Sequence, residues 1–428
     1  MKNSGIEWIG EIPDSWNVCR IKNLPDYSVE NCFIDGDWIE SPDIADSGIR
    51  YLTTGNVGDG QFKYQGNGYI TRETFDKLNC KFAYPGDWVI ARLNAPYGRS
   101  CILPNDEDRY VLAVDIVILR TKYNKKYLCY FTQCSEFQHA VEDFARGTAM
   151  KRISRTNLGA VKIVLPSIAE QDSIADCLGV KCAEVDKLIE VQQAQIDKLK
   201  EYKQSVITEA VTKGLDPTVP MKDSGVEWIG MIPEGWRVVK NKVLFQNVSI
   251  KGFGNARVLS LYRDLGVVPK DTREDNHNVT SLDTDGYKHV KINDLVINKM
   301  KAWSGSLAIS DYDGIVSPAY YVCKVNYKYV DKRFIHHYLR NKHMVALYEM
   351  YSAGLRVGQW DLAIDDFLNI EIAVPDSLRE QKEIAIYIDD KCAKIDKLIA
   401  IKQAKIDKLQ EYKKSLIYEY VTGKKEVM

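Results

Sequence analysis

Apolar side chains recur at alternating intervals of three and four residues along two long stretches of this chain. The first stretch, 170–212, has no proline and a single glycine, and the second, 380–422, has neither. This spacing, with Glu and Lys on the flanks, predicts two long helices that pair through a coiled-coil seam. The seam positions are Cys182, Val185, Ile189, Gln192, Ile196, Leu199, Lys203, Val206 and Ala210 in the first stretch, and Cys392, Ile395, Ile399, Lys402, Ile406, Leu409, Lys413, Leu416 and Tyr420 in the second.

The whole chain consists of two copies of one frame around two different inserts. Residues 2–16 return at 222–236, and residues 181–212 return at 391–422. The two stretches between these repeats barely match each other. Two such helices in one chain most simply pair with each other, and they run antiparallel if the halves are related by a pseudo-two-fold axis. Oligomerisation arms are the alternative interpretation.

The inserts have the short apolar runs of mixed α/β domains. Runs at 88–91, 114–119, 295–297 and 319–322 are typical of strands that end in Gly, Asn and Asp turns, and 334–348 is typical of a helix. The predicted fold is therefore α+β, with two mixed α/β domains separated by two long antiparallel helices that form an intramolecular, pseudo-two-fold symmetric coiled coil. We expect four segments, which are 1–166 (first domain with its box), 167–214 (first helix), 215–375 (linker, second box and second domain) and 376–428 (second helix and tail).

Bulk composition says more about the compartment than about the function. The 428 residues carry a formal net charge of -1, so no global basic field indicates nucleic acid. The ten cysteines form no CxxC pairs, as is typical of reduced thiols. No apolar run is long enough for a signal core or a membrane span. We therefore expect a soluble cytoplasmic protein that does not associate with membranes.

Short boxes with a shared Trp-Ile-Gly-x-Ile-Pro core precede both inserts, and a Glu-Gln pair follows a proline after each insert. In the boxes Trp8, Gly10, Pro13 and Trp16 match Trp228, Gly230, Pro233 and Trp236, and the later pairs are Glu170-Gln171 after Pro166 and Glu380-Gln381 after Pro375. Together with the runs 299–305 and 317–320, this order resembles the specificity (S) subunit of type I restriction–modification enzymes over essentially the whole chain. Each junction here has one proline, where the family often has two.

The resemblance implies a function in DNA recognition. Each insert would be a target recognition domain that reads one half of a bipartite site in double-stranded DNA, and the paired helices would set the spacing. Two methyltransferase subunits would dock along this frame, and restriction/translocase subunits would join them in the full complex. The family's S subunit catalyses nothing and holds no cofactor, so S-adenosylmethionine is expected on the methyltransferase partner.

Cations and planar polar side chains in turns without acidic residues are the candidate DNA contacts. Cations bind phosphates, whereas Arg and Gln suit the edges of guanine and adenine. No acidic residue occurs from 144 to 169, and a second basic turn lies at 354–360. The candidates are Arg146, Thr148, Lys151, Arg152 and Arg155 in the first insert, and Lys299, Lys301, Arg356 and Gln359 in the second. A solvated basic loop is the alternative in each case.

Other conspicuous residues fit packing better than chemistry. The box tryptophans and Trp303 are expected to pack, and the cation-rich stretch 332–343 is expected to be largely a solvated helix face. Its histidines lack a ligand pattern, so no metal is expected. The segment 94–97 matches an amino-methyltransferase motif only in part and lacks a cofactor loop. The chain is therefore expected not to be an enzyme, and a coiled-coil adaptor that binds proteins through its inserts is the alternative function.

Overall fold

The two long helices are shared between two compact units of the chain. The computed structural model describes residues 1–66, 68–146, 151–263, 265–272, 284–356 and 359–427, without the side chains of 355, 356 and 359. Unit 1 comprises Met1–Gln193 and Ala404–Met428, and unit 2 comprises Ala194–Gln403. Each unit therefore contains half of each long helix, whereas the segments expected from the sequence end where the helices begin. None of the described helices is long and apolar enough to cross a membrane.

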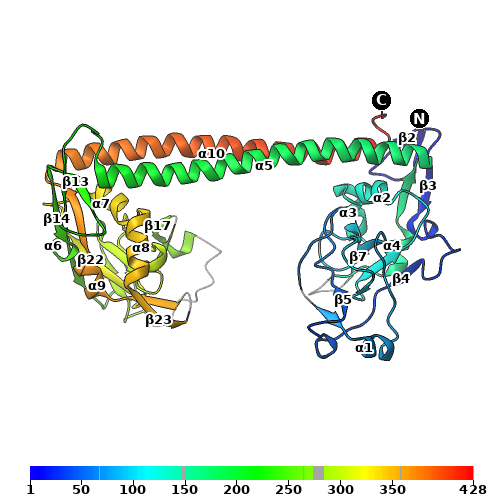
Figure 1. Ribbon diagram of the computed structural model, residues 1–428, viewed down its shortest axis with the longest axis horizontal. Coiled ribbons are helices and arrows are strands. Elements are labelled where there is room, and N and C mark those ends of the chain that lie inside the picture. Colours follow the sequence, from blue (N-terminus) through cyan, green and yellow to red (C-terminus); the bar gives the residue numbers. More distant parts are fainter. Residues whose placement is uncertain (67, 147–150, 264, 273–283, 357–358, 428) are drawn as a thin grey trace. The chain divides into compact units, whose positions relative to one another are not determined.

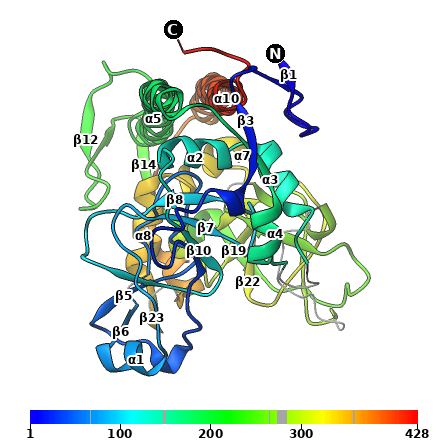
Figure 2. The ribbon, with the colours of Figure 1, turned by 90° about the vertical axis from the view of Figure 1, so that its right-hand side faces the viewer.

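Helices α5 (Ile168–Lys213) and α10 (Leu378–Val421) run antiparallel in both units (Figures 1 and 2). In unit 1, Lys413 Nζ lies 2.7 Å from a carboxylate oxygen of Asp186. In unit 2, Lys203 Nζ lies 2.7 Å from a carboxylate oxygen of Asp396. The two ion pairs occupy the same positions of the sequence repeat with the helices exchanged, so each unit contains the same local pairing.

The predicted seam lies on the buried side of both helices. Lys203 and Lys413, at polar seam positions, form the two ion pairs, and Lys402 Nζ donates to Gln195 Oε1 at 2.5 Å. These polar seam groups thus contact the partner helix as well. The apolar seam residues are either buried (Val185, Ile196, Val206, Ile395, Ile406 and Leu416) or half-buried (Ile189, Leu199, Ile399 and Leu409).

Unit 1 places a four-stranded antiparallel sheet between helices and a smaller sheet. Along its central strand, Trp88 and Ile90 share a core with helices α2 and α3, whereas Val89 and Ala91 face the smaller sheet. Because both faces are covered, the two central strands, 88–91 and 116–119, are apolar throughout. The large sheet has the order β4 (Phe33–Asp35), β10 (Ile116–Leu119), β7 (Trp88–Ala91) and β8 (Ser100–Ile102). The small sheet has the order β6 (Tyr69–Ile70), β5 (Ile49–Leu52) and β9 (Tyr110–Leu112). The helices are α1 (Arg72–Lys77), α2 (Lys125–Thr132), α3 (Ser135–Glu142) and α4 (Arg155–Ala160).

Unit 2 has the same central arrangement despite its different sequence. Leu295 and Ile297 face the helices, whereas Val296 packs toward smaller strand pairs. The four-stranded sheet has the order β15–β22–β19–β20, which corresponds strand by strand to β4–β10–β7–β8. Its strands are β15 (Phe245–Val248), β22 (Tyr320–Val325), β19 (Leu295–Asn298) and β20 (Leu307–Ile309). The helices of the unit are α6 (Asn241–Leu244), α7 (Lys332–Leu339), α8 (Lys342–Tyr351) and α9 (Ile364–Asn369). The smaller strand pairs are β16 (Leu259–Tyr262) with β17 (Gly266–Pro269), β18 (Lys288–Val290) with β21 (Gly314–Val316), and β23 (Ser352–Arg356) with β24 (Gln359–Leu362).

The repeated boxes connect each insert to the helices. Each box forms a hairpin and the next strand, which pairs with the last strand of the insert. Trp16 Nε1 donates to Glu170 Oε1 at 3.3 Å, and Trp236 Nε1 donates to Glu380 Oε1 at 2.8 Å. Both indoles are buried, as expected for anchors. The strands are β1 (Lys2–Asn3), β2 (Glu11–Ile12), β3 (Asn17–Arg20) and β11 (Lys162–Leu165) in unit 1, and β12 (Met221–Asp223), β13 (Met231–Pro233), β14 (Trp236–Lys240) and β25 (Glu371–Pro375) in unit 2.

The glutamine of each Glu-Gln pair is fully buried and connects three segments. Gln171 accepts the Asn124 amide at 3.0 Å and donates to the Pro166 carbonyl at 3.0 Å. Gln381 accepts the Asp331 amide at 2.7 Å and donates to the carbonyls of Pro375 and Tyr329. Asn124 and Asp331 are the N-caps of α2 and α7. In both units the glutamine therefore fixes the start of an insert helix to the start of a long helix.

Candidate nucleic-acid interface

In each unit, the segment after the basic turn pairs with the end of the central strand. In unit 1 the Ile153 amide donates to the Arg92 carbonyl at 3.1 Å, one residue beyond β7. In unit 2 the Leu362 amide donates to the Lys299 carbonyl at 3.0 Å, one residue beyond β19. The residues that follow the two basic turns, Ile153 and Leu362, therefore occupy equivalent places in the two domains.

The candidate residues of the first insert lie together around this turn. Arg146 and Arg152 exchange two backbone hydrogen bonds, of 2.9 and 2.8 Å, so they face each other across it. Lys151 lies beside Arg152, and Arg155 begins α4, whose N-cap Ser154 accepts the Asn157 amide. Thr148 lies outside the described residues.

Most of these cations have acidic partners. Arg152 Nε lies 2.7 Å from Asp115, Arg155 Nη1 lies 3.6 Å from Asp35, and Lys151 Nζ lies 3.8 Å from Glu142. Arg146 instead donates to the backbone carbonyls of Asp143 and Ala145. The Arg152 and Arg155 side chains are about 40% exposed. Because partly exposed ion pairs are weak, a phosphate group can replace the carboxylate at modest cost.

Arg92 organises this cluster, although it is not among the residues predicted from the sequence. Its side chain is 3% exposed and lies 2.8 Å from Asp35. It also donates to the carbonyls of Ile153 and Val114 at 2.8 and 2.6 Å. Burial lowers the pKa of Arg92, and the negative charge of Asp35 opposes that shift. Arg92 thus holds the basic turn against the sheet. Its only signal in the sequence is a charge at the end of an apolar strand.

The second insert carries fewer cations at the equivalent place. Lys299 Nζ lies 3.2 Å from Asp361, and Lys301 is exposed. Arg356 and Gln359 face each other at the ends of β23 and β24, and their side chains lie outside the description. Trp303 packs edge-to-face on Trp360, with ring centroids 5.4 Å apart, and donates to the Met300 carbonyl. This packing agrees with the role expected for Trp303.

The cation-rich stretch of α7 and α8 is less solvated than the sequence analysis expected. His336 and His337 are half-buried, because this face of α7 turns toward the long helices. His337 Nε2 lies 2.7 Å from Asp389 of α10, which also pairs with Arg333. Among the described residues, no group of three or more His, Cys, Asp or Glu side chains is placed to hold a metal ion.

Comparison with known proteins identifies relatives of both halves. The family model described as "Type I restriction modification DNA specificity domain" matches residues 13–201 and 233–411. The chain is 27% identical over 192 residues to the type I restriction enzyme MjaVIII specificity subunit of Methanocaldococcus jannaschii, where the match spans 43% of each protein. It is 27% identical over 449 residues to the putative type I restriction enzyme MjaX specificity subunit of the same organism, covering 97% of this chain and 95% of that protein.

Solved structures share the fold at low sequence identity. A chain from a study of complex assembly and conformational transition of the type I R-M system superimposes with a TM-score of 0.69 and 13% identity, covering 96% of this chain and 98% of that one. The HsdS subunit from Thermoanaerobacter tengcongensis gives a TM-score of 0.50 at 14% identity with the same coverage. These likenesses concern the fold.

Proposed function

Because the chain belongs to the type I restriction–modification DNA specificity family, we propose that its two recognition domains each read one half of a bipartite site in double-stranded DNA. One observation carries the proposal. The two domains have the same strand order and the same turn position, yet they differ in the side chains at that turn. Equivalent scaffolds with different surface residues suit the reading of two different half-sites, and the chain itself needs no catalytic role.

The chemistry of the turn in unit 1 suits contact with a phosphate backbone. Arg152 and Arg155 are held in place by carboxylates but remain partly exposed. Contacts to phosphate fix the register of a domain on the duplex, whereas base-edge contacts give the specificity. In unit 2 we assign the base-reading role to Arg356 and Gln359, whose side-chain chemistry suits guanine and adenine.

The paired helices would set the distance between half-sites. The 46 residues of α5 correspond to roughly 70 Å of helix. Inserting two heptads at matching places in α5 and α10 preserves the seam and lengthens the pair by about 21 Å. We expect the spacer of the recognised site to lengthen while both half-sites stay unchanged. An unchanged spacer would contradict this role, and inserting heptads into α5 alone is the control that breaks the pairing.

Two methyltransferase subunits would dock on equivalent surfaces of the two units. Each unit exposes three large apolar side chains at matching repeat positions of its helices, and large exposed apolar groups are typical of interaction sites. The S-adenosylmethionine would be bound by these partners, and restriction/translocase subunits would join them in the cytoplasm. The exposed residues are Leu188, Val191 and Tyr412 in unit 1, and Leu398, Ile401 and Tyr202 in unit 2.

Docking can be tested by counting bound methyltransferase subunits in native mass spectrometry. Leu188→Ser with Tyr412→Ser should reduce the stoichiometry from two to one, and the equivalent pair in unit 2 should do the same. All four changes together should abolish binding. Lys187→Ala with Lys397→Ala, which alters exposed charged positions on the same helices, should leave two subunits bound. Full occupancy in the fourfold variant would reject these surfaces.

The recognition function is tested by a genome-wide adenine-methylation map in cells expressing the methyltransferase partner with and without this chain. We expect a new motif of two short defined halves around an undefined gap. Exchanging the unit 1 insert for that of a relative should change one half of the motif. If no chain-dependent methylation occurs with a folded partner, the recognition function is wrong and the adaptor function gains support.

A further inference from the structure

A cleft of about 660 Å³ opens in unit 2 between α7 and the paired long helices. Unit 1 has a cleft of about 260 Å³ at the equivalent place, between α2 and the same helix pair. The two clefts share the lysine and cysteine of the helix repeat, which are Lys203 and Cys392 in unit 2 and Lys413 and Cys182 in unit 1. The frame is therefore the same, and the inserts determine how the clefts differ.

The inserts give the two clefts different chemical character, although the unit 1 cleft also has two cations, Lys126 and Lys413. Cys129, Tyr130 and Gln133 line the cleft in unit 1, together with the carboxylate of Asp186. At the matching positions of α7, unit 2 has His336, His337 and Arg340, and Lys342 stands where α3 begins with Ser135. Among the described residues that line the unit 2 cleft, there is no Asp or Glu.

His336 reports the electrostatic environment of the unit 2 cleft. Burial lowers its pKa to about 3, and the positive charge of Arg340 contributes to the shift. Burial, followed by Arg333 and Arg340, lowers the pKa of His337 to about 4. Within the described part of the chain, no hydrogen-bond partner contacts the His336 ring. His337 already faces Asp389, so the half-buried His336 ring beside Arg340 is the imidazole that is placed to contact an anion in the cleft.

We propose that the cleft between α7 and the long helices of unit 2 is a binding site for a phosphate group, held by Arg340, Lys342 and the imidazole of His336. The Arg340 guanidinium is already oriented, because it donates to the carbonyls of Leu307 and Arg263. Its planar fork suits phosphate oxygens, and Lys342 adds a mobile point charge. Several cations around one space favour a multiply charged anion over a single carboxylate.

The phosphate group can come from a free phosphorylated small molecule or from the backbone of bound duplex DNA. The volume of the cleft exceeds the needs of one phosphate, so pyrophosphate is a suitable probe of the first source. For the second source, the linear dependence of log Kd on log salt concentration counts backbone contacts. This second measurement rests on the proposed DNA recognition, whereas the first requires no DNA.

The test is calorimetric titration of the full chain with pyrophosphate at low salt, compared among single variants. Arg340→Gln and Lys342→Ser each introduce the residue that unit 1 has at that position. We expect each to weaken binding at least tenfold. Lys328→Ser, an exposed position of unit 2 outside the cleft, removes the same charge and should leave binding unchanged. Lys342 is exposed, so Lys342→Ser carries the test if Arg340→Gln impairs folding.

Three results decide between the sources. Pyrophosphate binding that both cleft variants weaken supports a free phosphate ligand. If pyrophosphate does not bind, but the cleft variants lower the salt slope for target DNA by about one while Lys328→Ser does not, the ligand is a backbone phosphate. If neither effect occurs while the methylation map still shows a bipartite motif, the phosphate site is overturned and the recognition function stands.

Discussion

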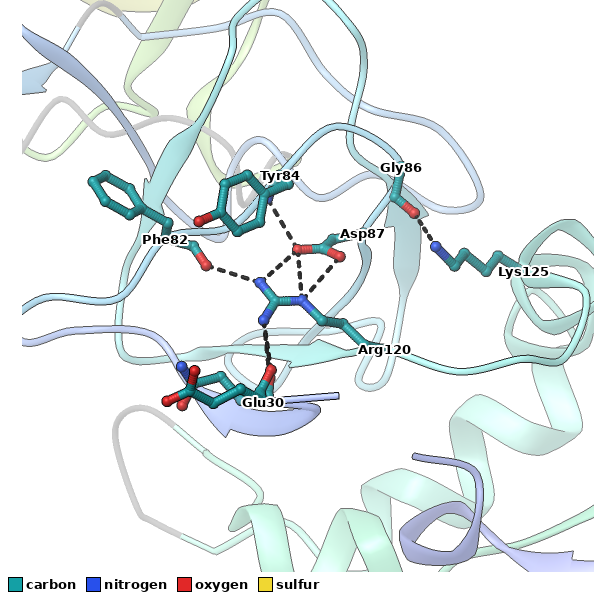
Figure 3. Close-up of polar contacts among 8 residues, drawn as sticks. Glu30, Phe82, Tyr84, Gly86, Asp87, Arg120 and Lys125 are labelled. Carbon is teal, nitrogen blue, oxygen red and sulfur yellow. Dashed lines mark hydrogen bonds and ion pairs between the residues drawn. The ribbon is translucent and has the colours of Figure 1, made fainter. Parts of the chain in front are cut away.

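An aspartate precedes the central strand in both units, and the two units hold it in different ways. In unit 1, Asp87 forms hydrogen bonds of 3.0–3.2 Å with the Arg120 guanidinium, which also donates to the carbonyls of Phe82 and Glu30 (Figure 3). In both units the carboxylate accepts the amide three residues earlier at 2.9 Å, from Tyr84 to Asp87 in unit 1 and from Lys291 to Asp294 in unit 2. The strand register places Lys324 of unit 2 at the position that Arg120 has beside Asp87, and Lys324 is exposed.

The difference shows which interactions the shared topology requires. The backbone bonds recur, because the amides of Arg120 and Asn326, each directly after the paired strand, donate to Cys32 and Leu244, each directly before the first strand of the sheet. Among the partners of the aspartate side chain, the amide three residues earlier recurs, whereas the Arg120 guanidinium does not. The frame therefore fixes the course of the chain, while each insert satisfies its buried groups with its own residues. That independence allows one insert to diverge without disturbing the other.

Removing the guanidinium should give the largest effect. We expect Arg120→Met to destabilise unit 1 by about 3–5 kcal/mol, because it leaves a buried carboxylate without its charged partner. Hydrogen exchange resolved by segment should show the loss in unit 1 and little change in unit 2. The matched change Lys324→Met should cost about 1 kcal/mol or less, since Lys324 is exposed and its attraction to Asp294 is screened by water. Equal losses at the two positions would contradict the comparison.

The buried glutamines test an interaction that the units share. Gln171→Leu and Gln381→Leu should each cost about 1–3 kcal/mol, because they leave buried backbone groups without partners. Gln381 makes three such bonds and Gln171 makes two, so the loss at Gln381 should be the larger. Denaturant unfolding of the single variants measures both. A neutral result at either position would show that water replaces the amide.

A smaller change in stability should have opposite signs when Asp294 and Asp87 are each replaced by asparagine. Burial raises the pKa of Asp294, so the folded state binds more protons than the unfolded state between the ordinary aspartate pKa and the raised one. Stability from this group is therefore lost as pH rises through that window. Asp294→Asn should be more stable than the parent at neutral pH, with the gain shrinking toward pH 4. Asp87→Asn should instead be destabilising at neutral pH, because it removes the charge that faces Arg120. Urea unfolding across pH checks both signs.

The sequence predicted the frame and the helices better than the interface. The 3–4 spacing gives the seam directly, and the repeat is visible without any structure. The shared topology of the inserts was not predictable, because the strands are apolar on both faces and the matching turns differ in composition. The Arg92 cluster was missed for another reason. Asp35, Asp115 and Arg152 are far apart in sequence, and only folding places these acids beside the basic turn.

The smallest expected effect concerns the part of the molecule where the units agree most. Asp186–Lys413 and Asp396–Lys203 are the same ion pair in the two units, and each has a side chain at least 40% exposed. Double-mutant cycles with alanine should therefore give coupling energies of about 0.2–1 kcal/mol that fall with added salt. The two cycles should agree within a few tenths of a kcal/mol if the helix frame is equivalent in both units. A coupling confined to one unit would mean that its insert, rather than the repeated helix, orients the lysine.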